Sequence, residues 1–175
     1  PDDEKVLQKA LEALHHSSLQ LIIAPHEISA KHIDELKLLF PGSILYSQLK
    51  NSGNQAPDSR VLIIDTIGIL SRLYHYATVT YVGGGFKPKG LHNTLEAAVY
   101  GNPVIIGPNF EHFIEASGLI HSKAASSIRT EAALINVLNE YLQNTNGRYE
   151  EACKAANQFV EDHAGATASI LSYIQ

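Results

Sequence analysis

Residues Tyr81 to Gly107 read YVGGGFKPKGLHNTLEAAVYGNPVIIG, and this stretch decides the fold. Small and apolar residues lead into Gly83, Gly84 and Gly85, which let a backbone turn sharply and approach a ligand with no side chain in the way. The pattern after them predicts a helix over 91–100, whose free N–H groups and positive dipole end point back at the glycines. A glycine turn between a strand and a helix start therefore predicts a site for an anion such as a phosphate.

Positive charge is concentrated locally beside this turn. Lys87 and Lys89 follow the glycines, whereas the 13 Lys and Arg residues of the chain are otherwise scattered and the formal net charge is -5. A nucleic-acid surface needs clustered positive charge against the phosphates. We therefore expect no nucleic-acid partner and interpret the two lysines as a local exception.

The length and composition are those of one compact, soluble domain. A domain of 175 residues buries roughly two thirds of the surface that its unfolded chain exposes, and 45% of this chain is hydrophobic. No run approaches the roughly 18 apolar residues that cross a bilayer, and the acidic, amphipathic N-terminus is unlike a signal peptide. Because the sequence contains no Met, we interpret it as a processed product or an excised piece of a longer protein.

Short apolar runs alternate with helical patterns along the chain. Strands are predicted at Leu19–Ala24, Ser43–Tyr46, Val61–Ile64, Val79–Val82, Pro103–Ile106 and Ser126–Arg129. Helices are predicted at 3–16, 29–40, 67–76, 91–100 and 110–121, followed by a helical C-terminal segment over about 130–175 with helices at 130–144, 147–162 and 165–174. Alternating units with Val/Ile/Leu-rich strands predict an α/β fold, namely a doubly wound, Rossmann-like parallel sheet.

Polar or small residues follow most of the predicted strands. In a parallel sheet of this kind the ligand site forms beyond the carboxyl ends of the strands, so these residues are expected to share one rim. They are His26 after the first strand, Asp65, Thr66 and Gly68 after the third, the three glycines after the fourth, and Asn109 after the fifth.

Glu96 is the most distinctive polar residue of the predicted helix. It stands four residues after His92 and one turn inside an otherwise apolar helix. A ribose diol offers two hydroxyl donors to such a carboxylate, and His92 and Asn93, nearer to the helix start, can contact a phosphate or a sugar. A solvated Glu96 that simply pairs with His92 stays open as the alternative.

Two common nucleotide motifs and a metal motif are absent from the sequence. There is no GxxxxGK[ST], and GGGF does not supply GxGxxG between a first strand and its helix, so ATP hydrolysis and NAD binding lose support. The nine histidines are dispersed without an HExxH or a comparable set of close ligands, so we expect no metal.

The same residues resemble the signature of a known family. GGGFKPKGLHNTLEAAVYGNPVIIGPN is similar to the signature of the 3-deoxy-D-manno-octulosonic acid (Kdo) transferases, which build the inner core of lipopolysaccharide. The resemblance extends to IIAPHEI and VLIIDTIGILSRLYHYATVTYVGG, and it covers most of residues 19–121 in order and spacing. It implies a GT-B glycosyltransferase of which this chain is the C-terminal, nucleotide-sugar-binding half as a single domain over 1–175, with the N-terminal acceptor domain absent.

The resemblance also implies a donor site for CMP-Kdo. It makes Glu96 the ribose ligand, places the glycines near the CMP phosphate and the sugar, and gives residues 65–68 to the cytosine pocket. A helix N-cap by Asp65 or Thr66 is an equally good reason for those two residues. The complete implied set is His26, Asp65, Thr66, Ile67, Gly68, Gly83, Gly84, Gly85, Lys89, His92, Asn93 and Glu96, with Asn109 as a contact to the donor sugar.

The implied reaction is the inverting transfer of Kdo from CMP-Kdo to a lipid A precursor, with no metal or other cofactor. Donors at a helix N-terminus would stabilise the charge on the departing phosphate. The family's general base is an acidic residue of the N-terminal domain, so no catalytic residue is assigned here, and the fragment is expected to bind without catalysing. The family works at the cytoplasmic face of the bacterial inner membrane, which this chain would reach, like the lipid A precursor, only through the full-length protein.

Two other classes of function stay open. One is another GT-B glycosyltransferase or an epimerase that uses a UDP-sugar, for which the same glutamate would serve. The other is a non-catalytic α/β binding module, which predicts no nucleotide affinity and leaves the glycines, lysines and Glu96 unexplained as a group.

Overall fold

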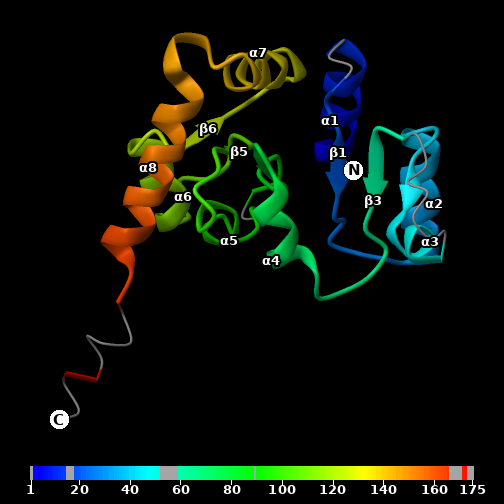
Figure 1. The fold of residues 1–175 in the computed structure, drawn as a ribbon, viewed down its shortest axis with the longest axis horizontal. Coiled ribbons are helices and arrows are strands. Elements are labelled where there is room, and N and C mark those ends of the chain that lie inside the picture. Colours follow the sequence, from blue (N-terminus) through cyan, green and yellow to red (C-terminus); the bar gives the residue numbers. More distant parts are fainter. Residues whose placement is uncertain (1, 15–17, 52–58, 89, 166–170, 173–175) are drawn as a thin grey trace. The chain divides into compact units, whose positions relative to one another are not determined.

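The computed structural model describes residues 2–14, 18–51, 59–88, 90–165 and 171–172. The chain divides into two compact units, Pro1–Leu73 and Tyr74–Gln175, whose elements can be followed by label in Figure 1. The single domain expected over 1–175 remains a prediction.

The first unit has one three-stranded parallel sheet with the strand order β1-β3-β2. In register, Leu21 pairs with Val61 and Ile44 pairs with Leu62, so β3 is the central strand. The elements of this unit are α1 (Asp2–Ala13), β1 (Leu21–Ile23), α2 (Ala30–Leu39), β2 (Ile44–Leu45), α3 (Tyr46–Asn51), β3 (Val61–Ile63) and α4 (Leu70–Leu73).

Helix α2 shows how local sequence sets this unit. Ser29 caps the helix, because its side chain accepts a hydrogen bond from the His32 backbone at 3.3 Å. Helical spacing then puts Ile33 and Leu36 on one face, where both are buried against the sheet residue Ile63 and its neighbours in the core. The side chain of His32 lies 2.9 Å from a carboxylate oxygen of Glu4, which ties α2 to α1.

The second unit has its own three-stranded parallel sheet, ordered β4-β5-β6. The central strand β5 consists of Val and Ile and is buried along its whole length, as expected of a strand covered on both faces. The elements of this unit are η1 (Tyr74–Tyr76), β4 (Thr80–Val82), α5 (Leu95–Ala98), β5 (Val104–Ile106), α6 (Ile114–His121), β6 (Ala125–Ser127), α7 (Glu131–Leu142), η2 (Thr145–Gly147) and α8 (Arg148–His163).

The long helix α8 holds this unit together by contacting both α5 and α6. Ala152, Ala156 and Phe159 form its buried face. A Cβ atom on Gly118 of α6 would lie 2.5 Å from Cε2 of the Phe159 ring, so the absence of a side chain there lets the two helices meet. Figure 1 shows α8 running past α6 and α5, with β6 leading into α7 above them.

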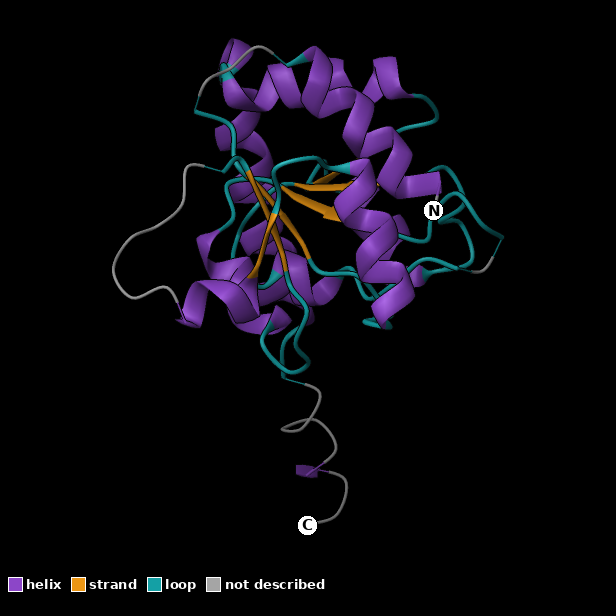
Figure 2. Ribbon diagram, turned by 90° about the vertical axis from the view of Figure 1, so that its right-hand side faces the viewer, coloured by secondary structure: helices purple, strands orange, loops and turns teal. Residues whose placement is uncertain are grey.

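The α/β class and the parallel strands predicted from sequence are confirmed, and every expected strand is present within about two residues of its predicted bounds. Figure 2 shows that the strands are short and that helix and loop make up most of the rest. The short helix α3 was not predicted, because its first residue, Tyr46, continues the apolar run of β2. Most of the helix predicted at 165–174 lies outside the described residues.

Candidate functional site

The glycine turn after β4 has a backbone that only glycine fits. Gly84 has a φ of +89°, in the left-handed region, and a Cβ atom there would collide with the carbonyl oxygen of Gly90. Gly85 is buried, and a Cβ atom on it would lie 2.7 Å from the backbone nitrogen of Gly107. The sequence prediction of a turn built on bare backbone is therefore confirmed for these two positions.

Backbone and side-chain hydrogen bonds hold the turn in place. The Lys87 amide donates to Gly84 O at 3.0 Å, and the His92 amide donates to Gly83 O at 3.2 Å. Gly85 O accepts two hydrogen bonds from Asn109, one from its backbone amide at 2.9 Å and one from its side-chain Nδ2 at 3.1 Å. The turn thus joins the loop after β4 to the loop after β5.

The helix predicted over 91–100 is wrong in extent, since α5 covers only Leu95–Ala98. The Asn93 side chain accepts a hydrogen bond from the Leu95 amide at 3.0 Å, which is a local turn that competes with helix at this point. Gly101, with a φ of +71°, ends the segment on the other side. Because His92 precedes the helix, the predicted pairing of His92 and Glu96 one helical turn apart on one face is also wrong.

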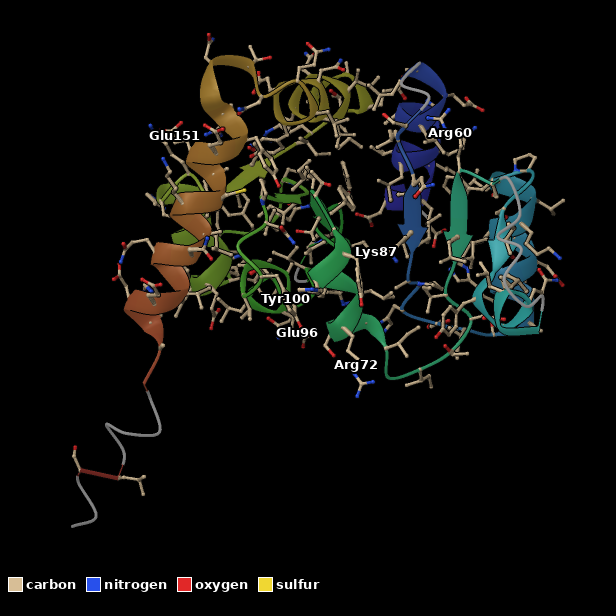
Figure 3. The ribbon with its side chains drawn as sticks, viewed as in Figure 1. Arg60, Arg72, Lys87, Glu96, Tyr100 and Glu151 are labelled. Atoms are coloured by element: carbon tan, nitrogen blue, oxygen red, sulfur yellow. The ribbon has the colours of Figure 1, made fainter. Side chains whose placement is uncertain are left out.

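Glu96 is exposed and is oriented by Asn93 instead. Its Oε1 accepts a hydrogen bond from Asn93 Nδ2 at 3.0 Å. Burial raises the pKa of the Tyr74 hydroxyl, and the nearby Glu96 carboxylate raises it further. Figure 3 places Glu96 and Tyr100 near α5, whereas Glu151 lies on α8 away from them. Glu96 is therefore a fixed, accessible carboxylate rather than a freely solvated one.

An open cleft of about 360 Å³ lies at the segment that leads into α5. His92 and Asn93 line one side of it, and Phe113 and Glu115 at the start of α6 line another. The remaining lining residues are Leu91, Thr94 and Leu95. Glu115 was missed from the sequence, where only its place in the first turn of the helix after the fifth strand could have indicated it.

A second hollow, of about 260 Å³, lies at η2 and the start of α8. It is lined by Glu140, Thr145, Asn146, Arg148 and Glu151, none of which was predicted as a ligand. Arg148 Nη1 lies 3.7 Å from Oε2 of Glu151, and Arg148 Nη2 donates to Ser126 Oγ at 3.3 Å. The hydrogen bond to Ser126 links α8 to β6, and the two contacts give Arg148 a structural role.

In the first unit, Asp65 links β3 to α3. Its carboxylate accepts hydrogen bonds from the Ser47 amide at 2.9 Å and from the Ser47 hydroxyl. Burial raises the pKa of Asp65, but the hydrogen bonds from Ser47 outweigh burial and leave that pKa below its ordinary value. The alternative of a structural role for Asp65 gains support, although the helix that it serves is α3 and not the one that follows it.

The other predicted residues of the first unit differ in exposure. Thr66 Oγ1 is buried and has no hydrogen-bond partner among the residues that the structure describes. Ile67 is 85% exposed, Gly68 has a φ of +88°, and His26 is exposed. An exposed isoleucine next to a left-handed glycine marks a surface turn at the carboxyl end of β3.

The structure brings together the predicted residues that lie in the second unit. Gly83 is bonded to His92, Gly85 to Asn109, and Asn93 to Glu96. Lys89 lies outside the described residues. Across the described ranges, no group of three or more His, Cys, Asp or Glu residues could hold a metal ion, and no helix is long and apolar enough to cross a membrane.

Known 3-deoxy-D-manno-octulosonic acid transferases are similar to this chain along most of its length. That of Chlamydia trachomatis is 31% identical over 150 residues, which are 85% of this chain and 34% of that protein. That of Aquifex aeolicus is 32% identical over 146 residues, which are 79% of this chain and 38% of that protein. That of Rickettsia prowazekii is 28% identical over 169 residues, which are 93% of this chain and 36% of that protein. No protein-family model matches the chain.

The chain thus spans about a third of the length of the curated relatives it matches. Among solved structures, the C-terminal CMP-Kdo binding domain of WaaA from Acinetobacter baumannii matches 90% of this chain and 82% of that chain, with a TM-score of 0.75. At 20% identity this match concerns the fold, and it confirms the predicted fold class. The resemblance to Kdo transferases is confirmed by the relatives in sequence.

Proposed function

We propose that this chain is the donor-binding part of a Kdo transferase and that it binds CMP-Kdo. The main observation behind this proposal is the Gly84–Gly85 turn. Its backbone leaves no room for a side chain, and it is hydrogen-bonded to the segment that carries His92, Asn93 and Glu96. The similarity in sequence to Kdo transferases and the fold shared with a CMP-Kdo binding domain both support this proposal.

Each part of the site suits one part of the donor. The backbone amides of the turn suit the phosphate, because such amides bind anions without a compensating side chain. Asn93 engages Oε1 of Glu96, so Oε2 is left to accept hydroxyl donors from the ribose.

The chemistry proposed for this site is stabilisation of a leaving group. When the bond between the Kdo anomeric carbon and the phosphate oxygen breaks, negative charge grows on the phosphate of CMP. Preorganised amide donors, with the positive charge of Lys87 nearby in the sequence, stabilise that charge more in the transition state than in the ground state. We propose that inversion results from attack by the acceptor hydroxyl on the face opposite to the phosphate.

The remaining parts of the proposal concern the full-length protein. We propose a lipid A precursor as the acceptor and the cytoplasmic face of the inner membrane as the place of reaction. We also propose that no metal or other cofactor takes part, since the phosphate charge is met by amides and lysine. These points extend the named activity of the relatives to this chain.

Calorimetric titration of the 175-residue chain tests the proposed function. CMP and CMP-Kdo are expected to bind with similar affinity, and UDP and UDP-sugars are expected to bind at least tenfold more weakly. Binding of UDP in the absence of CMP binding would indicate a UDP-sugar enzyme instead. Absence of binding by every nucleotide would indicate a non-catalytic module.

A further inference from the structure

Asn109 makes an unusual double contact with a single backbone oxygen. Its own amide donates to Gly85 O at 2.9 Å, and its side-chain Nδ2 donates to the same oxygen at 3.1 Å. A carbonyl oxygen has two lone pairs, so both hydrogen bonds can form at once. Asn109 is itself exposed, so its side chain is not buried there for packing.

Close backbone contact fixes the same peptide group from another direction. A Cβ atom on Gly85 would lie 2.7 Å from Gly107 N, and one on Gly107 would lie 2.7 Å from Gly85 O and 2.8 Å from Phe86 N. The peptide group that joins Gly85 to Phe86 therefore lies directly against Gly107. With its oxygen held by Asn109, this peptide group has little freedom to rotate.

Peptide geometry carries this constraint to the next amide. In a planar trans peptide the C=O and N–H bonds point in opposite directions, so holding Gly85 O directs the Phe86 N–H away from Asn109. Within the described ranges, the Phe86 N–H and the Gly85 N–H have no hydrogen-bond acceptor. Because Gly85 is buried and Phe86 is partly buried, unpaired amides there are costly unless a ligand or water accepts from them.

We infer that Asn109 is a positioning residue that orients the Gly85–Phe86 peptide so that its amide donates to the phosphate of a bound nucleotide. This inference rests on the proposed function. It differs from the contact to the donor sugar expected from sequence, because the side-chain nitrogen of Asn109 is already engaged with Gly85. Asn109 acts on the phosphate only through the backbone.

Three ligands, two variants of Asn109 and one control variant separate the positioning role from its alternatives. Cytidine lacks the phosphate, CMP carries it, and CMP-Kdo adds the sugar. In Asn109→Ala, affinity for CMP and for CMP-Kdo is expected to fall by the same factor, roughly tenfold for the loss of one preorganised donor, while cytidine affinity stays unchanged. Asn109→Ser keeps a short hydroxyl donor and is expected to recover part of the loss, and Asn136→Ala, an exposed position on α7, is the matched control.

The amide of Phe86 gives a direct readout by NMR. Its ¹H–¹⁵N signal is expected to shift on addition of CMP and not of cytidine in the wild-type chain, and to shift less in Asn109→Ala. An equal response of this amide to cytidine and to CMP contradicts the inference without any variant. The wild-type measurement therefore remains decisive even if Asn109→Ala does not fold.

The other outcomes are distinguishable. If Asn109→Ala binds CMP as Asn136→Ala does, the inference is overturned and the proposed function stands. A loss confined to CMP-Kdo would make Asn109 a sugar ligand, and an equal loss for all three ligands with a lower melting temperature would make its role structural; either result overturns the inference. If the wild-type chain binds no CMP, the proposed function fails and the inference fails with it.

Discussion

The carboxylate of Glu96 is oriented before any ligand arrives, because Asn93 Nδ2 donates to its Oε1 at 3.0 Å. If Oε2 accepts from the ribose diol, Glu96→Gln replaces a charged acceptor by an amide and weakens the contact. We expect CMP affinity to fall by roughly 1.5–3 kcal/mol, the value of a hydrogen bond to a charged group. The preference for CMP over 2′-deoxy-CMP is expected to shrink at the same time, as measured by calorimetry.

Glu161→Gln serves as the control for this variant. Glu161 is exposed on α8, so the substitution changes the net charge equally without touching the turn or the cleft. An undiminished preference for CMP over 2′-deoxy-CMP in Glu96→Gln would show that Glu96 does not contact the ribose.

Gly84 and Gly147 allow the cost of a side chain to be separated from the cost of backbone strain. Both have positive φ, at +89° and +73°, but a Cβ atom on Gly84 collides with Gly90 O whereas one on Gly147 meets nothing within 4 Å. We expect Gly147→Ala to cost about 1 kcal/mol of unfolding free energy and Gly84→Ala to cost about 3 kcal/mol. Urea unfolding measures both, and equal losses would mean that the turn relaxes to admit a methyl group.

At the scale of elements, the hydrogen bonds from Ser47 to Asp65 connect the start of α3 to the end of β3. The folded-state pKa of Asp65 lies below its ordinary value of 3.8, so the ionised form is favoured by folding. Its contribution to stability is therefore present above pH 3.8 and is lost as the pH falls through the folded-state pKa. Asp65→Asn is expected to lower stability at pH 7 by about 0.5 kcal/mol or less, because solvent screens the interaction.

The difference between the wild type and Asp65→Asn is expected to shrink when urea unfolding is repeated at about pH 3. Asp34→Asn, at an exposed position on α2 in the same unit, is the matched control. A difference that stays constant between pH 7 and pH 3 would show that the carboxylate charge of Asp65 does not stabilise the contact with Ser47.

The elements show where sequence reasoning succeeds and where it stops. Strands such as β5 were predictable because a run of Val and Ile between turn residues has few alternatives to a buried strand. The start of α5 was not predicted, because the apolar spacing of 91–100 also fits a helix. In the structure the Leu95 amide donates to the Asn93 side chain, a local hydrogen bond that competes with the first helical turn. Helix α3 was also not predicted, because the hydrogen bond from the Ser47 amide to the Asp65 side chain at its start joins residues far apart in the sequence.

The candidate site follows the same division. The need for glycine at 84 and 85 was visible in the sequence, since few other arrangements explain three consecutive glycines after a strand. The hydrogen-bond partners were not visible in the sequence. Asn93, and not His92, donates to Glu96, and Asn109 donates to the carbonyl oxygen of Gly85. The contact of Asn109 with Gly85 depends on the approach of loops from different strands, which residue spacing alone does not encode. The contact of Asn93 with Glu96 is local and follows from the late start of α5.

At the scale of the whole molecule, the similarity in sequence and the similarity in fold agree. Both match this chain to one part of a longer protein. The chain covers about a third of the length of its curated relatives, while the matching solved domain is covered over 82% of its length. The donor site proposed above lies within this part, because the turn, Glu96 and the cleft all belong to it. Transfer needs in addition an activated acceptor hydroxyl.

We therefore expect the 175-residue chain to bind CMP-Kdo without transferring Kdo. Stabilisation of the leaving phosphate lowers only one part of the barrier, and general-base catalysis, which typically adds a factor of about 10²–10⁴, must come from a correctly placed group. Incubation with CMP-Kdo and a lipid A precursor should release CMP no faster than buffer, as followed by chromatography. Glu115 is the carboxylate that could contradict this expectation, since it lines the same cleft as His92 and Asn93. Faster CMP release that Glu115→Gln abolishes would place the base within this chain.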